Sequence, residues 1–401
     1  MSKVMSVNAG SSSLKFQLIE MPSEKVIASG LVEKIGIQDP EFKIVVNGEK
    51  DNRHVECANH AEAVQLVLDA LIEKGAVKEL TEIQGVGHRI VHGGEYFSGS
   101  TVVDEDVASK VESLIPLAPL HNKAHLVGYE AFRKVLPEVG HVFVYDTAFH
   151  QSMPERSYLY ALPYEYYTDL KVRRYGAHGT SHLYVSQRCI DLLGNPEHSK
   201  IVTCHLGNGC SISAVVDGKC FKTSMGFTPL GGTVMGTRCG DIDPAIVPYL
   251  MKNLEGITAD DMSNIVMNKK SGLLGVSGVS SDSRYVWQAA DEGNHRATLA
   301  AYMQVDSFVS IVASYIALMG GCDAIVFTAG IGENDARVRR LVVEQLGTVF
   351  GCKINNEINE AKDTRGNETD LTAEGSSMKV FLIPTNEELV IARDTYRLLK
   401  L

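Results

Sequence analysis

Two glycine-rich turns that could bind phosphate lie 200 residues apart in this 401-residue chain. The first, residues 8–15, combines closely spaced backbone N–H groups with the hydroxyls of Ser11 and Ser13 and the charge of Lys15. The second, residues 205–209, reads His-Leu-Gly-Asn-Gly. Such N–H groups suit the oxygens of a polyphosphate, although a turn of this composition can also serve only to reverse the chain. Two of them facing each other could hold the phosphates from both sides.

A third glycine turn follows the apolar segment 324–328 and precedes a charged helix. Gly330 and Gly332 therefore stand where a strand passes into a helix, which is a common place for a nucleotide to bind. A dinucleotide motif would need a third glycine at the position of Asp335, and the chain has no Walker A motif and no protein-kinase catalytic motif. The sequence thus indicates a nucleotide site of another kind.

Arginines and histidines stand beside glycines in three further segments. Arg89 lies between His88 and His92, His178 lies in a glycine-containing turn, and Arg238 lies in a loop rich in acidic residues. Each of these side chains alone is more often structural than catalytic. Together, cations, amides and carboxylates are what an anionic transition state and its metal ion require, so we favour phosphoryl-transfer chemistry.

Strands and helices alternate along the chain, which is typical of an α/β protein. We expect strand–turn–strand hairpins at 4–19 and 201–216, strands at 85–91, 141–145 and 324–328, and helices near 61–74, 124–135, 243–253, 296–319 and 387–399. Two similar hairpins separated by half the chain length suggest a duplicated domain.

Composition limits the class of protein. A chain of 401 residues is expected to form two domains, and its net charge of −11 argues against coating nucleic acid or an anionic membrane. The eight cysteines show no metal-binding spacing, so reduced and mostly buried thiols are expected. Nothing near residue 1 resembles a secretory signal, which predicts a cytoplasmic location. The uncharged run between Asp306 and Asp323 is too short and too polar for a membrane span, and we expect a buried helix there.

Nine segments together resemble the acetokinase family of acetate and propionate kinases. They are NAGSSSLKF, GHRIVHGG, PLAPLHN, DTAFHQSMP, RRYGAHGTSH, HLGNG, MGTRCGDIDPA, FTAGIGEN and IPTNEEL, and they occur in this order over almost the whole chain. The resemblance implies an α/β fold of two related actin-like (ASKHA, ribonuclease H-like) domains with an active-site cleft between them. The N-terminal domain would comprise residues 1–148 and 385–401. Residues 149–384 would form the C-terminal domain, with the nucleotide site and a homodimer interface.

The resemblance also implies which residues bind the nucleotide and the metal ion. Asn8 and Glu387 match positions that hold Mg²⁺, for which Mn²⁺ could substitute. Residues that match contacts to ATP or ADP are Lys15, Ser11, Ser13, His205, Leu206, Gly207, Asn208, Gly209, Asp282, Ser283, Arg284, Gly330, Ile331, Gly332, Glu333 and Asn334.

Further matches imply the acid-binding and catalytic residues. Arg89, Val91, Leu120, His121 and Pro229 match the substrate site, and Asp146, His178 and Arg238 match the catalytic residues. Acetate is already ionised at neutral pH, so Asp146 has no proton to remove from it, and we expect this carboxylate to orient Arg238 or the waters of the metal.

The implied activity is reversible, Mg²⁺-dependent, in-line phosphoryl transfer between ATP and acetate, giving ADP and acetyl phosphate. A propionate kinase shares nearly all of these motifs, and an actin- or chaperone-like ATPase switch could share the two phosphate turns. Gly231 and Thr233 depart from the family pattern beside the expected acyl pocket, and Ala177 replaces a common phenylalanine. The expected partners are small molecules and a second copy of the chain, without nucleic acid or membrane.

Overall fold

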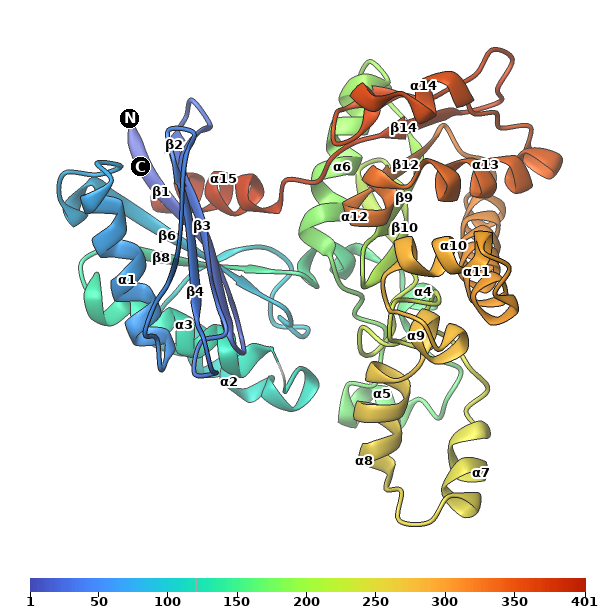
Figure 1. The fold of residues 1–401 in the computed structure, drawn as a ribbon, viewed down its shortest axis with the longest axis horizontal. Coiled ribbons are helices and arrows are strands. Elements are labelled where there is room, and N and C mark those ends of the chain that lie inside the picture. Colours follow the sequence, from blue (N-terminus) through green and yellow to red (C-terminus); the bar gives the residue numbers. More distant parts are fainter. Residues whose placement is uncertain (120) are drawn as a thin grey trace. The chain divides into compact units, whose positions relative to one another are not determined.

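The computed structural model describes residues 1–119 and 121–401, which divide into two compact units. Unit 1 comprises Met1–Phe149 and Asn386–Leu401, and unit 2 comprises His150–Thr385. Each unit contains a mixed β-sheet with helices packed against it (Figure 1). The α/β class predicted from the sequence is confirmed.

The sheet of unit 1 has the strand order β5-β4-β3-β2-β1-β6-β8-β7. The first five strands form an antiparallel meander, and β6 and β8 continue the sheet parallel to β1. The strands are β1 (Ser2–Gly10), β2 (Ser13–Met21), β3 (Lys25–Glu33), β4 (Glu41–Val46), β5 (Glu49–His54), β6 (Ile83–Ile90), β7 (Thr101–Val102) and β8 (Gly140–Tyr145).

Helices cover both faces of this sheet because alternate residues of β1 are buried on opposite sides. Met5 and Val7 share a core with α1 (His60–Glu73) and α3 (Asn122–Val135), whereas Val4 packs with Ala392 of α15 (Glu387–Leu399). A further helix, α2 (Glu105–Ser113), packs beside α3. The helices predicted near 61–74, 124–135 and 387–399 are confirmed.

Glycines in β6 let α15 approach the sheet closely. A Cβ at Gly87 would lie 2.4 Å from Cγ2 of Ile391 and 2.3 Å from Oγ1 of Thr395, which is less than any side chain tolerates. Arg89 follows Gly87 by two residues on the same strand and so extends from the same face of the sheet. This arrangement brings Arg89 toward the face on which α15 lies.

The sheet of unit 2 has the order β11-β10-β9-β12-β14-β13. Its strands are β9 (Lys200–Leu206), β10 (Cys210–Val216), β11 (Lys219–Thr223), β12 (Ala324–Thr328), β13 (Thr369–Asp370) and β14 (Lys379–Leu382). β9, β10 and β11 are antiparallel neighbours, and β12 and β14 continue the sheet parallel to β9. The first five strands in this order, β11-β10-β9-β12-β14, repeat the order and direction of β3-β2-β1-β6-β8 in unit 1. The duplication predicted from the two hairpins is therefore visible in the topology.

The helices of unit 2 surround its sheet and extend beyond it (Figure 1). They are α4 (Glu155–Tyr158), α5 (Glu165–Leu170), α6 (Gly179–Leu192), α7 (Ile246–Asn253), α8 (Ala259–Asp261), α9 (Gly272–Ser277), α10 (Ser283–Asp291), α11 (His295–Met319), α12 (Ala329–Asn334), α13 (Ala336–Phe350) and α14 (Asn356–Glu360). By length and composition α11 could cross a membrane, yet it carries a stripe of buried residues and packs against α9, α10, α13 and β10. It is a core helix, as predicted.

The cysteines are consistent with a reduced protein. All eight are unpaired thiols, and six of them are buried: Cys57, Cys189, Cys204, Cys210, Cys220 and Cys352. Burial raises the pKa of each of these six thiols, which suppresses the reactive thiolate.

Candidate active site

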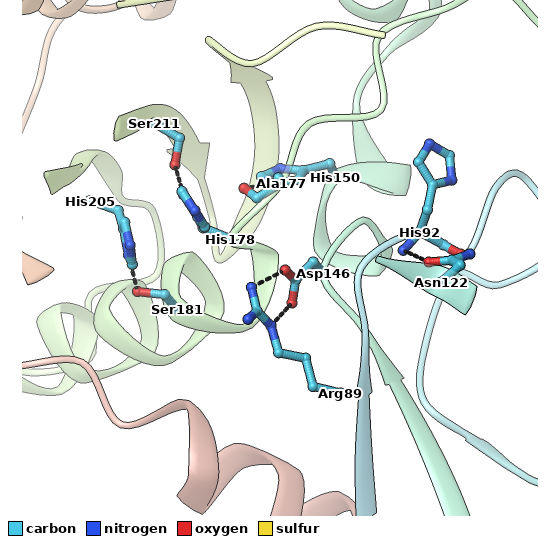
Figure 2. Close-up of polar contacts among 10 residues, drawn as sticks. All are labelled: Arg89, His92, Asn122, Asp146, His150, Ala177, His178, Ser181, His205 and Ser211. Atoms are coloured by element: carbon cyan, nitrogen blue, oxygen red, sulfur yellow. Dashed lines mark hydrogen bonds and ion pairs between the residues drawn. The ribbon is translucent and has the colours of Figure 1, made fainter. Parts of the chain in front are cut away.

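In unit 1, Arg89 and Asp146 form a bidentate ion pair at the carboxyl ends of two adjacent parallel strands. Arg89 is the second-last residue of β6, and Asp146 directly follows β8. Nε of Arg89 donates to Oδ1 at 3.0 Å and Nη2 donates to Oδ2 at 2.6 Å (Figure 2). The Asp146 side chain is buried, so this pair fixes the orientation of the Arg89 guanidinium. The residue that Asp146 orients within this unit is thus Arg89.

Glu387, at the first turn of α15, adds a second carboxylate near Arg89. Burial raises the pKa of Glu387 to about 7, and the attraction of Arg89 opposes that rise. Burial by itself would lower the pKa of Arg89, but Asp146, Glu387 and Glu388 more than offset it and raise the pKa above its usual value. The neighbouring Glu388 forms an ion pair with Lys15 on β2. The carboxylates of this cluster therefore outnumber its cations, which favours a bound metal ion.

The donor set in unit 1 fits Mg²⁺. Asn8 and Glu387 both offer oxygen atoms, which this hard cation prefers. Across residues 1–119 and 121–401 there is no cluster of three or more His, Cys, Asp or Glu side chains that could enclose a metal. Mg²⁺ usually keeps several waters and binds through one or two protein ligands plus substrate phosphates, so a site for this ion does not need such a cluster.

The loop after β6 is held by Asn122. Its side chain accepts a hydrogen bond from the N–H of His92 at 3.1 Å and donates to the carbonyl of the same residue at 2.9 Å. The strand ends at Ile90, one residue before Val91, so strand alternation does not determine where the buried Val91 side chain points. His121 is exposed at the start of α3. Leu120, assigned above to the substrate site, lies outside the described residues.

Unit 2 contains a cavity of about 700 Å³, large enough for a nucleotide. It is lined at one end by the turn between β9 and β10 and elsewhere by the segments leading into α10 and α12. The lining residues are Gly207, Asn208, Ser281, Asp282, Ser283, Arg284, Gly330, Ile331, Asn334, Asp335 and Arg365. Three glycine- or acid-containing segments that the sequence assigned to the nucleotide are thus gathered at one cavity.

Glu333 was expected at the nucleotide, but its carboxylate serves the backbone. Oε1 accepts hydrogen bonds from the N–H groups of Ala329 at 2.8 Å and Thr385 at 3.2 Å. Ala329 has φ of 66°, a left-handed conformation that is unfavourable for alanine and is here held by that hydrogen bond. Glu333 and the adjacent Gly332, which packs against Phe327, are absent from the cavity lining.

The side chains of Arg238 and His178 both lie close to Gly209. A Cβ at Gly209 would lie 3.1 Å from Nη1 of Arg238 and 3.7 Å from Nε2 of His178, so a side chain here would crowd the Arg238 guanidinium. Arg238 is largely buried, and burial lowers its pKa. Nη1 donates to the carbonyl of Pro229 at 3.3 Å, and no carboxylate in the described part of the chain forms an ion pair with Arg238. A buried cation without a carboxylate is suited to receive an anion.

His178 has a left-handed backbone, with φ of 56°, at the start of α6. Its ring stacks on that of His205, with 4.1 Å between centroids, and its Nδ1 lies 2.9 Å from Oγ of Ser211 (Figure 2). His205 in turn lies 2.8 Å from Oγ of Ser181 through Nδ1. A strained residue held by several contacts is typical of functional sites.

The loop that departs from the family pattern is tied down by Asp241. Its Oδ1 accepts from the N–H of Gly232 at 2.8 Å, and its own N–H donates to the carbonyl of Gly232 at 2.9 Å. A Cβ at Gly231 would lie 3.3 Å from the same carboxylate oxygen. The small residue at 231 therefore leaves room for this hydrogen bond, and the loop carrying Pro229 is anchored.

Sequence reasoning missed several residues of these sites. Ser281, Asp335 and Arg365 line the cavity but were not assigned to it. Ser281 and Asp335 directly adjoin segments that the sequence assigned to the nucleotide. Their position next to these segments could have indicated that they also line the cavity. Arg365 lies in a segment without any motif and could be found only from the fold.

Comparison with known proteins agrees with this geometry. The sequence profile of the acetokinase family matches residues 3–393. The chain is 54% identical over 404 residues to the acetate kinase of Geobacillus kaustophilus and 52% identical over 404 residues to that of Bacillus subtilis, covering 100% of both chains in each case. Among solved structures, acetate kinase from Porphyromonas gingivalis matches with a TM-score of 0.93 at 46% identity and 100% coverage of both chains. A propionate kinase from Francisella tularensis matches with a TM-score of 0.92 at 41% identity, covering 99% of this chain and 100% of that one. The chain belongs to the acetokinase family.

Proposed function

We propose that this chain is an acetate kinase, which transfers the γ-phosphoryl group of ATP to acetate and forms ADP and acetyl phosphate reversibly. The observation that carries the proposal is Arg238, a largely buried cation without a carboxylate partner in the described chain, placed next to His178 at the phosphate turn of a nucleotide-sized cavity. The relatives at 52–54% identity are named acetate kinase, which supports the same substrate.

In this mechanism the protein mainly stabilises charge. A transferring phosphoryl group spreads negative charge over its equatorial oxygens, and Arg238 and His178 donate hydrogen bonds to them. Arg89 binds the acetate carboxylate, and Asp146 fixes the guanidinium through the bidentate pair. Bound through Asn8 and Glu387, Mg²⁺ would neutralise part of the charge on the phosphates. No proton leaves acetate, so a general base is unnecessary.

Acetate is proposed as the preferred acid over propionate, with the buried apolar side chain of Val91 in unit 1 limiting the length of the acid. The side chain of Val91 is buried beyond the end of β6, and Pro229 is held by its contact with Arg238. An apolar pocket discriminates one methylene by about 1–3 kcal/mol, so propionate should react roughly 10- to 200-fold less efficiently.

We further propose a cytoplasmic homodimer that associates through unit 2. Support comes from α11, whose outer face exposes Leu299, Tyr302, Met303 and Leu318. Large apolar side chains gathered on one helix face are typical of a protein interface. Light scattering should report a dimer for the wild type and a shift toward monomer for Tyr302→Glu.

The function is tested by measuring ADP release and acyl phosphate together. Purified protein with ATP and Mg²⁺ is incubated with formate, acetate, propionate or butyrate, and the acyl phosphate is trapped with hydroxylamine. Hydroxamate and ADP should form in equal amounts, and their formation should be fastest with acetate. Equal or faster reaction with propionate would favour a propionate kinase, and ADP release without hydroxamate from any acid would favour an ATPase switch.

A further inference from the structure

A chain of buried hydrogen bonds runs from His178 into the sheet of unit 2. Nδ1 of His178 lies 2.9 Å from Oγ of Ser211, and the same oxygen lies 2.7 Å from Nε2 of His182. Nδ1 of His182 lies 2.7 Å from Oγ1 of Thr203. The side chains of Ser211, His182 and Thr203 are fully buried. These hydrogen bonds connect α6 to β9 and β10.

The geometry of α6 explains why the two histidines share Ser211. His178 precedes the helix and His182 lies four residues later, so both rings extend from one face of its first turn. The N–H of His182 donates to the carbonyl of His178 at 3.0 Å, which fixes their separation. Ser211 on β10 faces both rings from the sheet.

The direction of each hydrogen bond follows from the far end of the chain. Oγ1 of Thr203 also lies 3.4 Å from the carbonyl oxygen of Ser213, which can only accept, and a Thr203 hydroxyl that donates there accepts from Nδ1 of His182. Burial lowers the pKa of His182 well below 6.5, so its ring is neutral and its only proton is on Nδ1. In this arrangement Nε2 of His182 accepts the hydroxyl proton of Ser211. The Ser211 hydroxyl has only one proton, and it is donated to His182. The oxygen of Ser211 therefore accepts a hydrogen bond from Nδ1 of His178.

We propose that Ser211, supported by His182 and Thr203, is a positioning residue that keeps a proton on Nδ1 of His178 and directs Nε2 of that ring toward the transferring phosphoryl group. This inference rests on the proposed function for the identity of the phosphoryl group, whereas the tautomer is argued from the hydrogen bonds and the neutral, buried ring of His182. The hypothetical Cβ of Gly209 places Nε2 of His178 and Nη1 of Arg238 next to the same turn.

The proposal has a chemical consequence for His178. With Nδ1 protonated, Nε2 can donate a hydrogen bond to a phosphoryl oxygen only when the ring carries both protons and is an imidazolium. Groups near the ring include the stacked His205, Ser211 and, at the same turn as Gly209, the Arg238 guanidinium. Arg238 and His178 then act as two positive donors to one anionic group.

The test combines the tautomer of His178 with the kinetics of Ser211 variants. Ring ¹⁵N spectra of histidine-labelled protein, assigned with His178→Gln, should show the neutral His178 ring protonated on Nδ1. Ser211→Ala should lower kcat about 10- to 100-fold with the KM of ATP and of acetate changed less than about threefold, because a misplaced catalytic group costs rate and little binding. Ser211→Thr, which retains the hydroxyl, should recover part of the loss.

Ser186→Ala is the matched control, since Ser186 is a buried serine of α6 whose hydroxyl donates within its own helix, to the carbonyl of Leu183. It should leave kcat and the His178 spectrum unchanged. A neutral His178 ring protonated on Nε2 would overturn the proposal, as would Ser211→Ala with wild-type kcat. Failure of the proposed function would appear differently, as wild-type protein that makes no acyl phosphate while its His178 spectrum still reports the Nδ1 tautomer.

Discussion

Arg89 and Arg238 are two largely buried guanidinium groups with opposite surroundings. Arg89 is joined to Asp146 by two hydrogen bonds, whereas Arg238 has a backbone carbonyl as its closest polar partner. A cation already paired with a carboxylate is oriented but partly neutralised, and a cation without one keeps its full charge for a ligand. The two arginines are therefore expected to contribute differently to binding and to rate.

Replacing Arg238 should affect the rate most. Arg238→Ala is expected to lower kcat by about 10²–10³ with a small change in substrate KM, because its charge matters most during transfer. Arg89→Ala should place a larger share of its loss in the KM for acetate. Steady-state kinetics at saturating Mg²⁺ measure both effects, and Arg188→Ala, at an exposed ion pair with Glu368, is the control. An Arg238→Ala enzyme with normal kcat and only a raised acetate KM would show that this arginine serves binding alone.

Replacing Glu387 should affect the metal requirement. Glu387→Ala removes one proposed anchor of Mg²⁺, so the Mg²⁺ concentration for half-maximal rate should rise and kcat should fall, with little change in acetate KM. Glu56→Ala, at an exposed position of unit 1, is the control. Mg²⁺ titrations that give the same half-saturation for Glu387→Ala and the wild type would remove Glu387 from the metal site.

For individual residues, the sequence predicted which segments carry functional side chains better than it predicted which side chains contact each other. The residue types around Arg89, His178 and Arg238 indicated anion chemistry, but the pairing of Asp146 with Arg89 depends on the alignment of β6 with β8, which no local pattern contains. Glu333 lies within a segment that the sequence assigned to the nucleotide, but its carboxylate accepts hydrogen bonds from backbone N–H groups.

Among the elements, the glycine turns determine how closely ligands can approach. A Cβ at Gly330 in the first turn of α12 would meet no protein atom within 4 Å, although Gly330 lines the cavity. The space beside it is therefore open to a ligand. At Gly236, by contrast, the space is filled by protein, because a Cβ there would lie 2.1 Å from Oδ1 of Asn208.

Gly330→Ala should weaken nucleotide binding without harming the fold. The added methyl group enters the cavity, so the KM for ATP should rise, while Tm should stay constant or increase because alanine is favoured over glycine in a helix. Gly99→Ala adds a methyl group at an exposed position that is equally open and serves as control. If ATP KM in Gly330→Ala equals that of the wild type, the nucleotide does not contact this turn.

The elements themselves were largely predictable because hydrophobic periodicity and turn residues specify them locally. The hairpins and the helices at both ends of the chain follow from such patterns. The extension of the first sheet by β4 and β5 was missed, although Asn47-Gly48 between alternating segments is a hairpin signal. Val91 shows the limit of local patterns, because the strand ends one residue before it.

The stability of the whole molecule should depend on a set of buried, neutral histidines in unit 1. Burial lowers the pKa of His125 to about 3 and those of His92 and His141 to about 4, against 6.5 for the ordinary side chain. Between these values the unfolded chain binds more protons than the folded one. Stability should therefore be greatest above pH 6.5 and should fall as the pH decreases toward 4.

This effect predicts acid sensitivity that depends on particular histidines. At pH 5 each neutral histidine should cost on the order of 2 kcal/mol relative to pH 7. Urea midpoints followed by circular dichroism at both pH values should show a smaller difference for His141→Gln than for the wild type. His198→Gln, at an exposed position of unit 2, should keep the wild-type difference. An unchanged difference in His141→Gln would contradict the assignment of a neutral buried ring.

The central claim is that phosphoryl transfer occurs directly between a nucleotide and acetate. Phosphorus NMR of the enzyme with acetyl phosphate, ADP and Mg²⁺ tests it, because the γ-phosphate of ATP, acetyl phosphate and inorganic phosphate give separate signals. ATP should appear as acetyl phosphate disappears, with little inorganic phosphate, and Arg238→Ala should slow both changes equally. Conversion of acetyl phosphate to inorganic phosphate without ATP, or no reaction by the wild type, would contradict it.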